Sequence, residues 1–583
     1  VIEDGNILYA AQEERFSRKK NDEDFPILAL QNCLSYLNLS LFDIDTIVYF
    51  EKPFLKFERL INTYLNTAPR GLISFIHAMK VWTKDKLFIK QNIYSALKLA
   101  DPKFDKRKTT LLFSAHHLSH AASTFFPSPF EEAAILTIDG VGEYTTTSLY
   151  YGNGNNITQL KDIHFPHSIG LLYSAITYFL DFKVNSDEYK VMGLAAYGNA
   201  ESEETKRFIE IIENQLIHFK DNGNFELKMK YFSFHHSLTM VKIEKWEQLF
   251  GLKKRNAFEL TPSQCNLAFA FQKITEKAVL NLCNEIKKTT QSENLCLAGG
   301  VALNSVINGI IKDKKIFKNI FITPASGDAG GALGAAYSAY HLHFNQVRKI
   351  HLPDNLQNSL LGNHYSEIEI FDVIKQYPNH QKCATQEELC NKTAKLIAEG
   401  KVIGWFQGKM EFGPRALGNR SILADPRNET MQLHLNMKIK NRESFRPFAP
   451  AILEEEAHKY FELVGNSPYM LQVHQVKKEL LNPIPTNYTT LGIKEKLYLA
   501  KSSLPSITHV DFSARIQTVN KNQHPLFWEL INSFFNLTGC PILINTSFNT
   551  KDEPIVCSPI DAFNCFSRTG MDVLVIGNFI LTK

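Results

Sequence analysis

Short apolar runs that end in glycine or aspartate alternate with helix-like segments in the first part of the chain. AAILTIDG and TTTSLYYGNG form an expected hairpin, and LCLAGG and NIFITP are each followed by a helical pattern. Strands that alternate with helices build α/β domains around a parallel or mixed sheet. Ligands of such domains bind beyond the carboxyl ends of the strands. The residues that fall at these ends are Asp139, Gly299, Gly300 and Asp328.

The chain is too long for a single hydrophobic core. It has 583 residues, whereas single cores stop growing at about 250–300 residues. Residues 346–365 are polar, contain a proline and lack a sustained hydrophobic period, so we interpret them as a linker. An amphipathic helix at 385–401 and the strand VIGWFQG follow. The sequence therefore predicts a first α/β domain at 1–345 and a smaller α/β domain at 366–583.

Composition and charge limit the classes of protein to consider. Hydrophobic residues make up 44% of the chain, and 64 basic against 60 acidic residues give a net charge of +4. A disordered chain is less hydrophobic, and so balanced a charge gives no support for a nucleic-acid or membrane partner. Nine cysteines without a CxxC pair indicate reduced thiols, and no apolar run reaches the roughly 18–20 residues that span a bilayer. We expect a cytoplasmic protein, and a homodimer stays open.

The segment HHLSHAASTFF carries the first candidate site. On a helix, His116 and His120 project from one face, which is the geometry that seats a metal ion. An HxxxH pair alone is more often a packed or surface histidine pair. Asp139 and Asp328 follow short strands and shift this balance, because two imidazoles with two carboxylates suit iron(II), manganese or zinc. His117 points elsewhere on the helix and is left out of the site.

Two glycine-rich turns, AGGVALN and ASGDAGGALGAA, form the second candidate site. Glycines let the backbone approach a ligand closely, and amides at a following helix start attract phosphate. Such turns also serve plain packing, and neither matches a P-loop or the GxGxxG fingerprint. Two of them within 39 residues, one containing Asp328, favour a nucleotide pocket.

Two charged segments have mainly structural interpretations. In SDEYKVMGLAAYG, the residues Glu188 and Lys190 precede a helical stretch of small residues, which indicates a surface ion pair leading into a packed helix. In QEERFSRKK, the adjacent carboxylates Glu13 and Glu14 indicate salt-bridged structure rather than acid–base chemistry.

Basic residues gather in FGPRALGNRSILADPR and KIKNRESFRPFAP, where they alternate mainly with glycine, proline and phenylalanine. Planar guanidinium groups match phosphate and carboxylate oxygens, so we expect a preformed anion pocket. A solvated face is the ordinary interpretation of a charge run, and nucleic-acid binding is a rival that the balanced net charge disfavours. Arg515, before a strand, and Asn545, after one, are further candidate donors. The clustered residues are Arg415, Arg420, Arg427, Lys440, Arg442 and Arg446.

Together these segments closely resemble the O-carbamoyltransferases of the NodU/CmcH type, which include nodulation and antibiotic-tailoring enzymes. The motifs EERFSRKKND, HHLSHAAS, LTIDGVGE, SIGLLYSAIT, DEYKVMGLAAYG, GGVALN, FGPRALGNRSILADPR, NMKIKNRESFRPFAP, ARIQTV and ILINTSFN follow in family order. The resemblance implies an actin/hexokinase-like (ASKHA) ATPase-type first domain and a YrdC-like second domain. The second domain would make carbamoyl-adenylate from carbamoyl phosphate and ATP, and the first would pass the carbamoyl group to a hydroxyl of a sugar or natural-product acceptor.

The same resemblance assigns roles to individual residues. It implies one divalent metal, iron(II), held by His116, His120, Asp139 and Asp328. It implies nucleotide contacts at Gly299, Gly300, Asn304, Gly327 and Lys190. It implies catalytic contacts to carbamoyl phosphate and its adenylate at Lys440, Arg446, Arg515 and Asn545.

The start of the chain departs from the family pattern. Family members carry a His-Asp-x-Ser-Ala segment directly ahead of the residues that open this sequence, and its histidine is a candidate general base. The opening VIEDGNILYA predicts a hairpin that turns at Asp4-Gly5, so we expect a further strand ahead of residue 1.

Three alternatives stay open at this point. A threonylcarbamoyl-type transferase acting on tRNA shares the chemistry but needs an extended basic face. A nucleotide-binding ATPase or kinase of the same fold needs no second, arginine-rich site. A catalytically inactive scaffold is the third.

Overall fold

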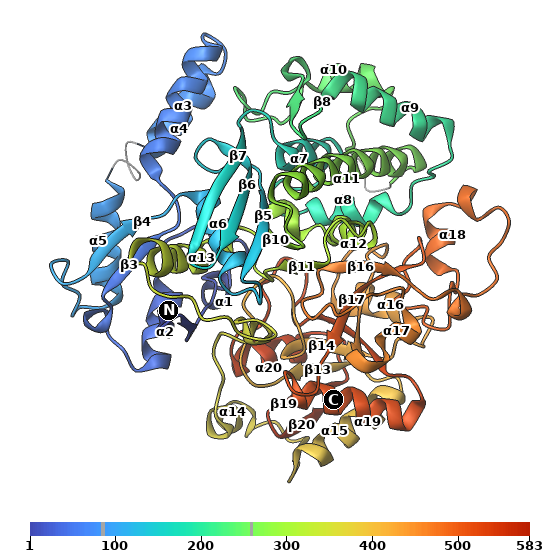
Figure 1. The fold of residues 1–583 in the computed structure, drawn as a ribbon. Helices are drawn as coiled ribbons and strands as arrows, with labels where there is room; N and C mark the ends of the chain where they lie inside the picture. Colours follow the sequence, from blue (N-terminus) through green and yellow to red (C-terminus); the bar gives the residue numbers. More distant parts are fainter. Residues whose placement is uncertain (83–87, 257–259) are drawn as a thin grey trace. The chain divides into compact units, whose positions relative to one another are not determined.

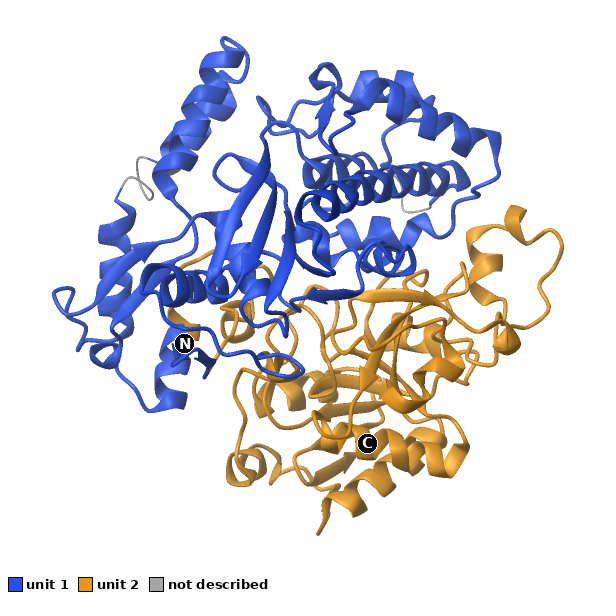
Figure 2. Ribbon diagram, in the orientation of Figure 1, with its two compact units in different colours: residues 1–8, 30–355 blue, residues 9–29, 356–583 orange. Residues whose placement is uncertain are grey.

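The computed structural model describes residues 1–82, 88–256 and 260–583, and it divides into two compact units (Figure 2). Unit 1 comprises Val1–Leu8 and Leu30–Asn355, and unit 2 comprises Tyr9–Ala29 and Leu356–Lys583. Each unit has a β-sheet of its own with packed helices. No helix in the described part of the chain is long and apolar enough to cross a membrane.

Unit 1 is built on a five-stranded mixed sheet. Its strands are β11 (Asn319–Ile322), β10 (Asn294–Ala298), β5 (Glu132–Ile138), β6 (Thr145–Asn153) and β7 (Asn156–His164), in that spatial order. Strand β10 runs parallel to both of its neighbours, whereas β5, β6 and β7 form an antiparallel meander. The four apolar runs of the sequence are therefore strands, and the predicted mixed α/β sheet and hairpin are confirmed.

Helices cover this sheet, as Figure 1 shows, with α6 and α13 to the left of it and α7 and α11 to the right. The long helix α11 begins at a capping box, in which Thr261 and Gln264 exchange hydrogen bonds around Pro262. Its buried Phe271 stacks on Trp246 of α10. These helices are α6 (His116–Phe125), α7 (Ile169–Phe179), α8 (Glu188–Ala195), α9 (Glu203–Ile211), α10 (Ile243–Phe250), α11 (Pro262–Thr290), α12 (Ser305–Asp313) and α13 (Gly331–Tyr337).

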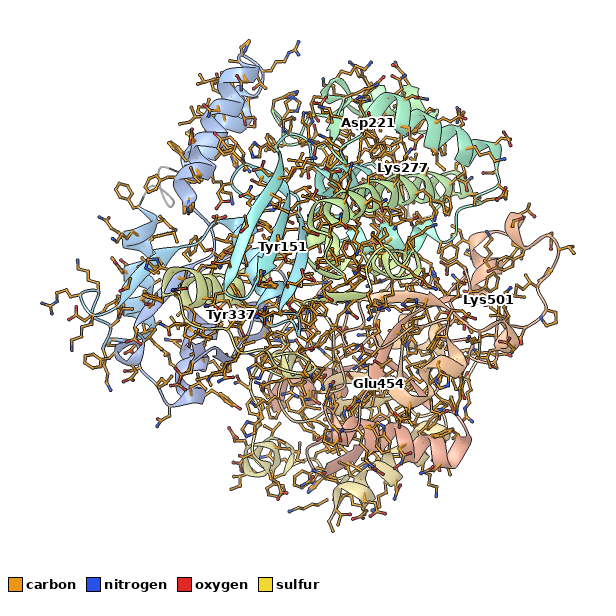
Figure 3. The ribbon with its side chains drawn as sticks, viewed as in Figure 1. Tyr151, Asp221, Lys277, Tyr337, Glu454 and Lys501 are labelled. Carbon is orange, nitrogen blue, oxygen red and sulfur yellow. The ribbon has the colours of Figure 1, made fainter. Side chains whose placement is uncertain are left out.

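One glycine sets how closely α6 and α13 approach. A Cβ atom on Gly334 would lie 1.7 Å from the carbonyl oxygen of Ser119, so only glycine fits there. On α13, Tyr337, labelled in Figure 3, is buried and its hydroxyl donates to the carbonyl oxygen of Gly5 at 3.4 Å. Gly5 and Asp4 have positive φ between β1 (Ile2–Glu3) and β2 (Asn6–Ile7), which confirms the predicted hairpin turn.

The remainder of unit 1 is a smaller layer around a two-stranded parallel sheet. Strands β3 (Thr46–Tyr49) and β4 (Thr110–Phe113) pair in it. Its helices are α2 (Ile27–Leu37, which starts in unit 2), α3 (Pro53–Thr67), α4 (Leu72–Val81) and α5 (Ile89–Ala100). Strands β8 (Ile217–Phe219) and β9 (Phe225–Leu227) form a separate hairpin.

Unit 2 contains a nine-stranded mixed sheet with a large apolar core. The strand order is β12 (His380–Lys382), β20 (Phe579–Thr582), β19 (Val573–Ile576), β13 (Ile403–Phe406), β14 (Arg420–Ala424), β18 (Ile542–Ser547), β15 (Ala449–Leu453), β17 (Ser513–Val519) and β16 (Gln472–Gln475). The pairs β13·β19 and β15·β17 are parallel, and the other pairs are antiparallel. The predicted helix at 385–401 is observed as α15 (Gln386–Ala398), and VIGWFQG supplies β13.

Several helices and turns frame the sheet of unit 2. Helix α15 packs against α19, and α20 packs against β13 and β19. Thr385 caps α15 by accepting a hydrogen bond from the Glu388 amide, and Gly400 ends the turn after it with φ of 83°. The helices are α1 (Glu14–Ser17), α14 (Glu367–Ile374), α15, α16 (Met431–His434), α17 (Ala457–Tyr460), α18 (Ile493–Tyr498), α19 (Pro525–Thr538) and α20 (Pro559–Arg568).

Candidate functional site

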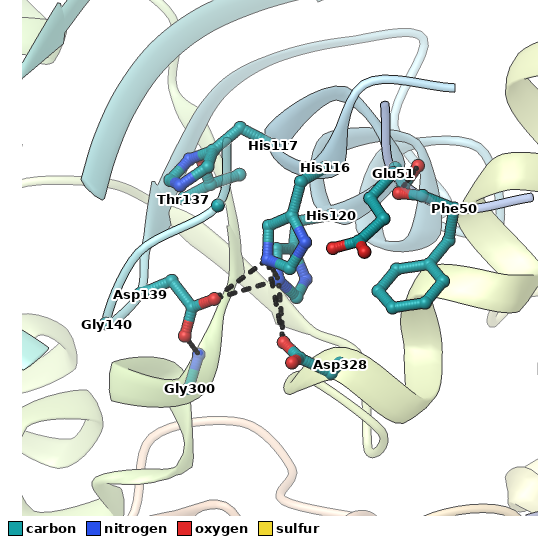
Figure 4. A network of polar contacts seen from close by, with 12 residues as sticks. Phe50, Glu51, His116, His117, His120, Thr137, Asp139, Gly140, Gly300 and Asp328 are labelled. Carbon is teal, nitrogen blue, oxygen red and sulfur yellow. Dashed lines mark hydrogen bonds and ion pairs between the residues drawn. The ribbon is translucent and has the colours of Figure 1, made fainter. Parts of the chain in front are cut away.

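Two imidazoles and two carboxylates converge in unit 1 (Figure 4). The Nε2 atoms of His116 and His120 lie 3.1 Å apart. An Oδ atom of Asp139 lies 2.9 and 3.4 Å from them, and one of Asp328 lies 3.6 and 3.5 Å from them. The structure thus brings together all four residues of the sequence-predicted metal site.

The spacing of these atoms fits a single metal ion. Ligand bonds of about 2.0–2.2 Å at tetrahedral or octahedral angles separate neighbouring ligand atoms by roughly 2.8–3.6 Å. The five separations given above fall in this range. His116 and His120 belong to successive turns of α6, Asp139 follows β5, and Asp328 opens a short 3₁₀ turn before α13. Three of the four side chains are buried, and the exposed Asp328 leaves one side of the cluster open.

The charges of the cluster are mutually dependent. Burial alone would lower the pKa of His120, but hydrogen bonds and charge interactions with Asp139 and Asp328 raise it to about 9. Burial alone would raise the pKa of Asp139, but His116 and His120 hold it well below its ordinary value. In the absence of a metal, Asp139 is therefore ionised beside a protonated His120, and a metal ion that binds His120 displaces this proton.

His117 is not part of this cluster, as the sequence indicates. Its Nδ1 atom hydrogen-bonds the hydroxyl of Thr137 at 2.8 Å and that of Ser148 at 3.2 Å. Burial, followed by the neighbouring imidazoles of His116 and His120, lowers its pKa well below the ordinary value. His117 is a neutral core residue.

Glu143 is a residue of this site that the sequence does not reveal. Its buried carboxylate accepts hydrogen bonds from the backbone amide of His116 at 3.0 Å and from that of Lys52 at 2.7 Å. It thus caps the N-terminus of the helix that carries both histidines. The preceding Gly142 lies against the His116 ring, where a Cβ atom would come within 2.9 Å. The only signal for Glu143 is its place in LTIDGVGE, four residues after Asp139.

The first glycine-rich turn lies directly beside the metal cluster. Gly299 has φ of 90°, and a Cβ atom on it would lie 2.3 Å from the carbonyl oxygen of Ile138. The Gly300 amide donates to Oδ1 of Asp139 at 3.1 Å. Gly327 has φ of −77°, so its backbone does not require glycine, and it directly precedes Asp328. The Gly299-Gly300 turn therefore orients the carboxylate of Asp139.

The two other predicted nucleotide contacts also have structural partners. The Asn304 side chain caps α12 by accepting from the Ile307 amide at 3.2 Å, and its Nδ2 donates to Gln272 at 3.0 Å. Lys190 is buried within α8 and pairs with Asp187 at 3.0 Å.

The surface ion pair expected of Glu188 and Lys190 is therefore wrong. Glu188 accepts hydrogen bonds from the Ser174 hydroxyl and the Asn185 amide, and Lys190 pairs instead with Asp187. The two residues lie within α8 rather than ahead of it.

A cluster of cationic side chains occupies unit 2. Arg515 is surrounded by Arg415, Arg442 and Arg446, whose charges, together with burial as the largest cause, lower its pKa well below the ordinary value. Arg442 is oriented by Asn436, which accepts from its Nε at 2.7 Å, and Arg446 lies 3.6 Å from Glu443. Guanidinium groups gathered in this way repel one another, so the arrangement suits an anion.

Lys440 lies in the same charged environment. Its buried ammonium donates to the carbonyl oxygen of Ser547 and, at 3.1 and 2.9 Å, to the carbonyl and side-chain oxygens of Asn549. Burial, then the charges of Arg442 and Arg446, lower its pKa well below the ordinary value. These oxygen acceptors fix the position of the Lys440 amine.

Asn545 lies on β18 with its side chain buried. Its Nδ2 donates to Gln517 at 2.7 Å and to the carbonyl oxygen of Ala416, beside Arg415, at 3.3 Å. Asn545 therefore links the strand to the Arg415 turn through its side chain.

Two of the six clustered basic residues do not belong to an anion pocket. Arg420 is fully buried, its guanidinium donates to backbone carbonyls and it lies over the ring of Phe406 at 3.7 Å. Arg427 forms a bidentate pair with Asp425. The expectation for these two arginines is wrong because backbone carbonyl groups accept the hydrogen bonds of Arg420 and Asp425 pairs with Arg427. Glu13 has a structural role, but its carboxylate accepts from the backbone amides of Leu28 and Ala29 and not from the expected salt-bridge partner. Glu14 lies 3.8 Å from Nε of Arg15.

Two family models match most of this chain. The family described as Carbamoyltransferase N-terminus matches residues 1–337, and Carbamoyltransferase C-terminus matches residues 394–583. An uncharacterized Synechocystis protein, sll1178, is 50% identical over 100% of this chain and 94% of its own length. Nodulation protein NolNO of Sinorhizobium fredii is 35% identical over 100% of this chain and 78% of its own.

Two further similarities are more limited in extent. Nodulation protein NolO of Bradyrhizobium diazoefficiens is 36% identical over 80% of this chain and 78% of its own. The crystal structure of HypF from T. kodakarensis aligns with 42% of this chain and 38% of that chain at 17% identity, with a TM-score of 0.22 that carries no argument. The two family matches and the full-length relatives show that this chain is an enzyme that transfers carbamoyl groups, and that it belongs to the carbamoyltransferase family with the nodulation proteins NolO, NolNO and U.

Proposed function

We propose that this carbamoyltransferase is an ATP-dependent O-carbamoyltransferase with two active sites. Unit 2 activates carbamoyl phosphate as carbamoyl-adenylate, and unit 1 transfers the carbamoyl group to a hydroxyl of a sugar or natural-product acceptor. The observation that carries the proposal is the presence of two chemically different sites in one chain, a His₂Asp₂ cluster and an arginine–lysine cluster. A single-step transferase has no use for both.

The cation cluster of unit 2 suits the first half-reaction. Both substrates are polyanions, and Arg415, Arg442, Arg446 and Arg515 gather positive charge that suits anionic ligands. A carbamate oxygen forms a bond to the α-phosphorus of ATP while the bond to pyrophosphate breaks. One water takes up the phosphoryl group of carbamoyl phosphate, so each adenylate formed releases one pyrophosphate and one orthophosphate. Fixed cations hold the two substrates in line for this displacement.

The His₂Asp₂ cluster suits the second half-reaction. His116, His120, Asp139 and Asp328 would hold one divalent metal, which we expect to be iron(II), and a bound metal there would act as a Lewis acid toward phosphate or carbonyl oxygens. The acceptor hydroxyl oxygen forms a bond to the carbamoyl carbon, the bond to the AMP oxygen breaks, and the hydroxyl proton leaves to a base. The chain's own contribution is to fix the cluster, because Glu143 holds His116 and the Gly300 amide holds Asp139.

The same proposal covers the fold and the domain roles. We assign carbamoyl transfer to residues 1–345 in an actin/hexokinase-like (ASKHA) fold and adenylate formation to residues 366–583 in a YrdC-like fold. The β11-β10-β5-β6-β7 sheet supports the first assignment, because an antiparallel meander joined by two parallel strands is the expected core of that fold. Nucleotide contacts near Gly299, Gly327, Asn304 and Lys190 belong to this proposal.

Pyrophosphate release in the absence of an acceptor tests the proposal. The protein is mixed with ATP and carbamoyl phosphate, and pyrophosphate and orthophosphate are both measured. We expect release in equal amounts from the wild type, loss of release in Lys440→Met, and retained release with loss of bound metal in His116→Ala. Lys459→Ala, which removes an exposed lysine paired with Glu456 in the same unit, is the matched control. A wild-type protein that releases no pyrophosphate would overturn the activation step.

A further inference from the structure

A segment from the beginning of the chain folds with unit 2 rather than with unit 1. Residues 9–29 join the unit whose remaining residues are 356–583. At the start of this segment, the buried Tyr9 hydroxyl donates to the Asn363 side chain, and the Ala10 amide donates to the carbonyl oxygen of Leu361 at 3.0 Å. The segment contains the EERFSRKK motif, to which the proposed function assigns no role.

Arg15 of this motif fixes the turn that presents Arg415. Its side chain is 2% exposed, and its Nη2 atom donates to the carbonyl oxygen of Gly413 at 2.6 Å. Gly413 lies two residues before Arg415 and has φ of 126°. Within the same turn, Glu411 accepts hydrogen bonds from three later backbone amides. Arg15 therefore joins the turn to the N-terminal segment at Gly413.

Arg18 fixes the loop that holds Lys440. Its Nη1 atom donates to the carbonyl oxygen of Ile555 at 2.7 Å and its Nη2 atom to that of Pro554 at 2.9 Å. These carbonyls close the loop 547–556, whose ends are joined by a hydrogen bond from the Val556 amide to the Phe548 carbonyl oxygen at 3.0 Å. Ser547 and Asn549 of this loop are the residues that hold the Lys440 ammonium.

The backbone of Arg18 gives independent support for a role of its side chain. Arg18 ends α1 in the left-handed conformation, with φ of 59° and ψ of 16°. Glycine or asparagine occupies this position at lower conformational cost. An arginine placed there, with its guanidinium on two carbonyl oxygens and 3.6 Å from Asp561, indicates that the side-chain contacts are what the position requires.

We propose that Arg15 and Arg18 are positioning residues of the unit 2 anion pocket, which fix the Arg415 turn and the Lys440 loop by hydrogen bonds to their carbonyl groups. We call these hydrogen bonds of Arg15 and Arg18 to the backbone carbonyl groups the clamp. The clamp follows from the contacts above, and its effect on the binding of carbamoyl phosphate rests on the proposed function. The two carbonyl-bound guanidinium groups do not touch substrate; they act through Arg415, Ser547 and Asn549.

Hydrogen exchange on the full-length chain tests the clamp without any assay of activity. The Arg18→Gly variant lacks the side-chain hydrogen bonds, and its glycine adopts the left-handed backbone conformation without strain. A change in exchange rates therefore cannot result from backbone strain at residue 18. We expect the amides of Lys551 and Val556 to exchange about tenfold faster, because the loop opens locally. Lys19→Ala, which removes an exposed neighbour paired with Asp22 and Asp24, is the matched control and leaves their exchange unchanged. Unchanged exchange in Arg18→Gly overturns the proposal.

Pyrophosphate release then tests the consequence for the pocket. We expect the KM for carbamoyl phosphate to rise by about 10- to 100-fold in Arg18→Gly, since misplacement by about 1 Å costs on that order. Arg18→Lys, which keeps one donor, restores part of the loss, and the metal content of unit 1 stays unchanged in both variants. Faster exchange with an unaltered KM overturns the positioning role. A wild-type chain without pyrophosphate release refutes the proposed function instead, and the exchange measurement still decides the clamp.

Discussion

The contact between α6 and α13 gives a prediction that depends on the structure alone. Gly334→Ala adds a Cβ atom 1.7 Å from the Ser119 carbonyl oxygen and 2.8 Å from the Ser123 amide nitrogen. Both are backbone atoms, so no side chain can rotate away from the new methyl group. Real Cβ contacts essentially never fall below 3.0 Å, which means that the helices must separate by about 1.3 Å.

The expected cost follows from two opposing effects. Overpacking of a core typically destabilises by about 1–3 kcal/mol and occasionally by more. Alanine gains up to about 1 kcal/mol over glycine in a helix interior, which offsets part of this cost. Because two backbones collide, we expect a net loss of about 2 kcal/mol or more. Displacement of α6 also widens the 3.5 and 3.6 Å separations between its histidines and Asp328, so metal affinity falls as well.

Scanning calorimetry of the metal-free protein and a metal titration measure the two effects. Ala332→Gly is the matched control, since it changes an exposed position of the same helix and costs about 1 kcal/mol through helix propensity without any collision. We expect Gly334→Ala to lower both stability and metal affinity, and Ala332→Gly to lower stability only. A Gly334→Ala protein as stable as the wild type, with full metal affinity, would refute the packing argument.

Three further predictions concern polar groups. Glu143→Gln weakens the cap of α6 and lowers stability by about 0.5–2 kcal/mol together with metal affinity, measured by calorimetry; unchanged metal affinity contradicts the role of the carboxylate. Burial lowers the pKa of His524 to about 4; because the unfolded chain binds this proton below its ordinary pKa of about 6.5, stability falls by up to ~3 kcal/mol between pH 6.5 and 4. Denaturant titrations at several pH values should show this loss of stability in the wild type and its absence in His524→Phe. If the stability of the two proteins changes with pH in parallel, His524 does not cause the loss. Arg420→Met removes the side-chain donor to the carbonyl oxygens of Gln407 and Gly408 and costs about 2–5 kcal/mol in chemical denaturation. A wild-type midpoint would show that these carbonyl groups find other partners.

Hydrophobic periodicity predicts much of the fold because it reflects burial directly. The run AAILTI is β5, buried along almost its whole length, and TQEELCNKTAKLIA is α15 with its threonine cap. The histidine pair of the metal cluster is also accessible from sequence, since HxxxH on a helix places both side chains on one face. The positions of Asp139 and Asp328 relative to α6 depend in addition on strand order, which no local pattern contains.

The function of each basic residue in unit 2 is less accessible from sequence. Arg415 and Arg420 stand five residues apart in one motif, yet Arg415 joins the cation cluster whereas Arg420 donates to carbonyl oxygens and lies over the Phe406 ring. Which of these outcomes applies depends on partners distant in sequence. The same holds for Arg15, whose acceptor Gly413 lies 398 residues away along the chain.

The turn at Gly299-Gly300 shows how a structural and a functional role can coincide. A Cβ atom at Gly300 would lie 2.9 Å from Oδ1 of Asp139, and the amide of Gly300 donates to the same oxygen at 3.1 Å. Close packing against Oδ1 of Asp139 therefore explains why residue 300 is a glycine. The other oxygen of the same carboxylate, Oδ2, lies 2.9 Å from Nε2 of His116. Any ligand that displaces this turn must also move Asp139. Binding of a ligand at the Gly299-Gly300 turn and the geometry of the metal cluster are therefore coupled through the side chain of Asp139.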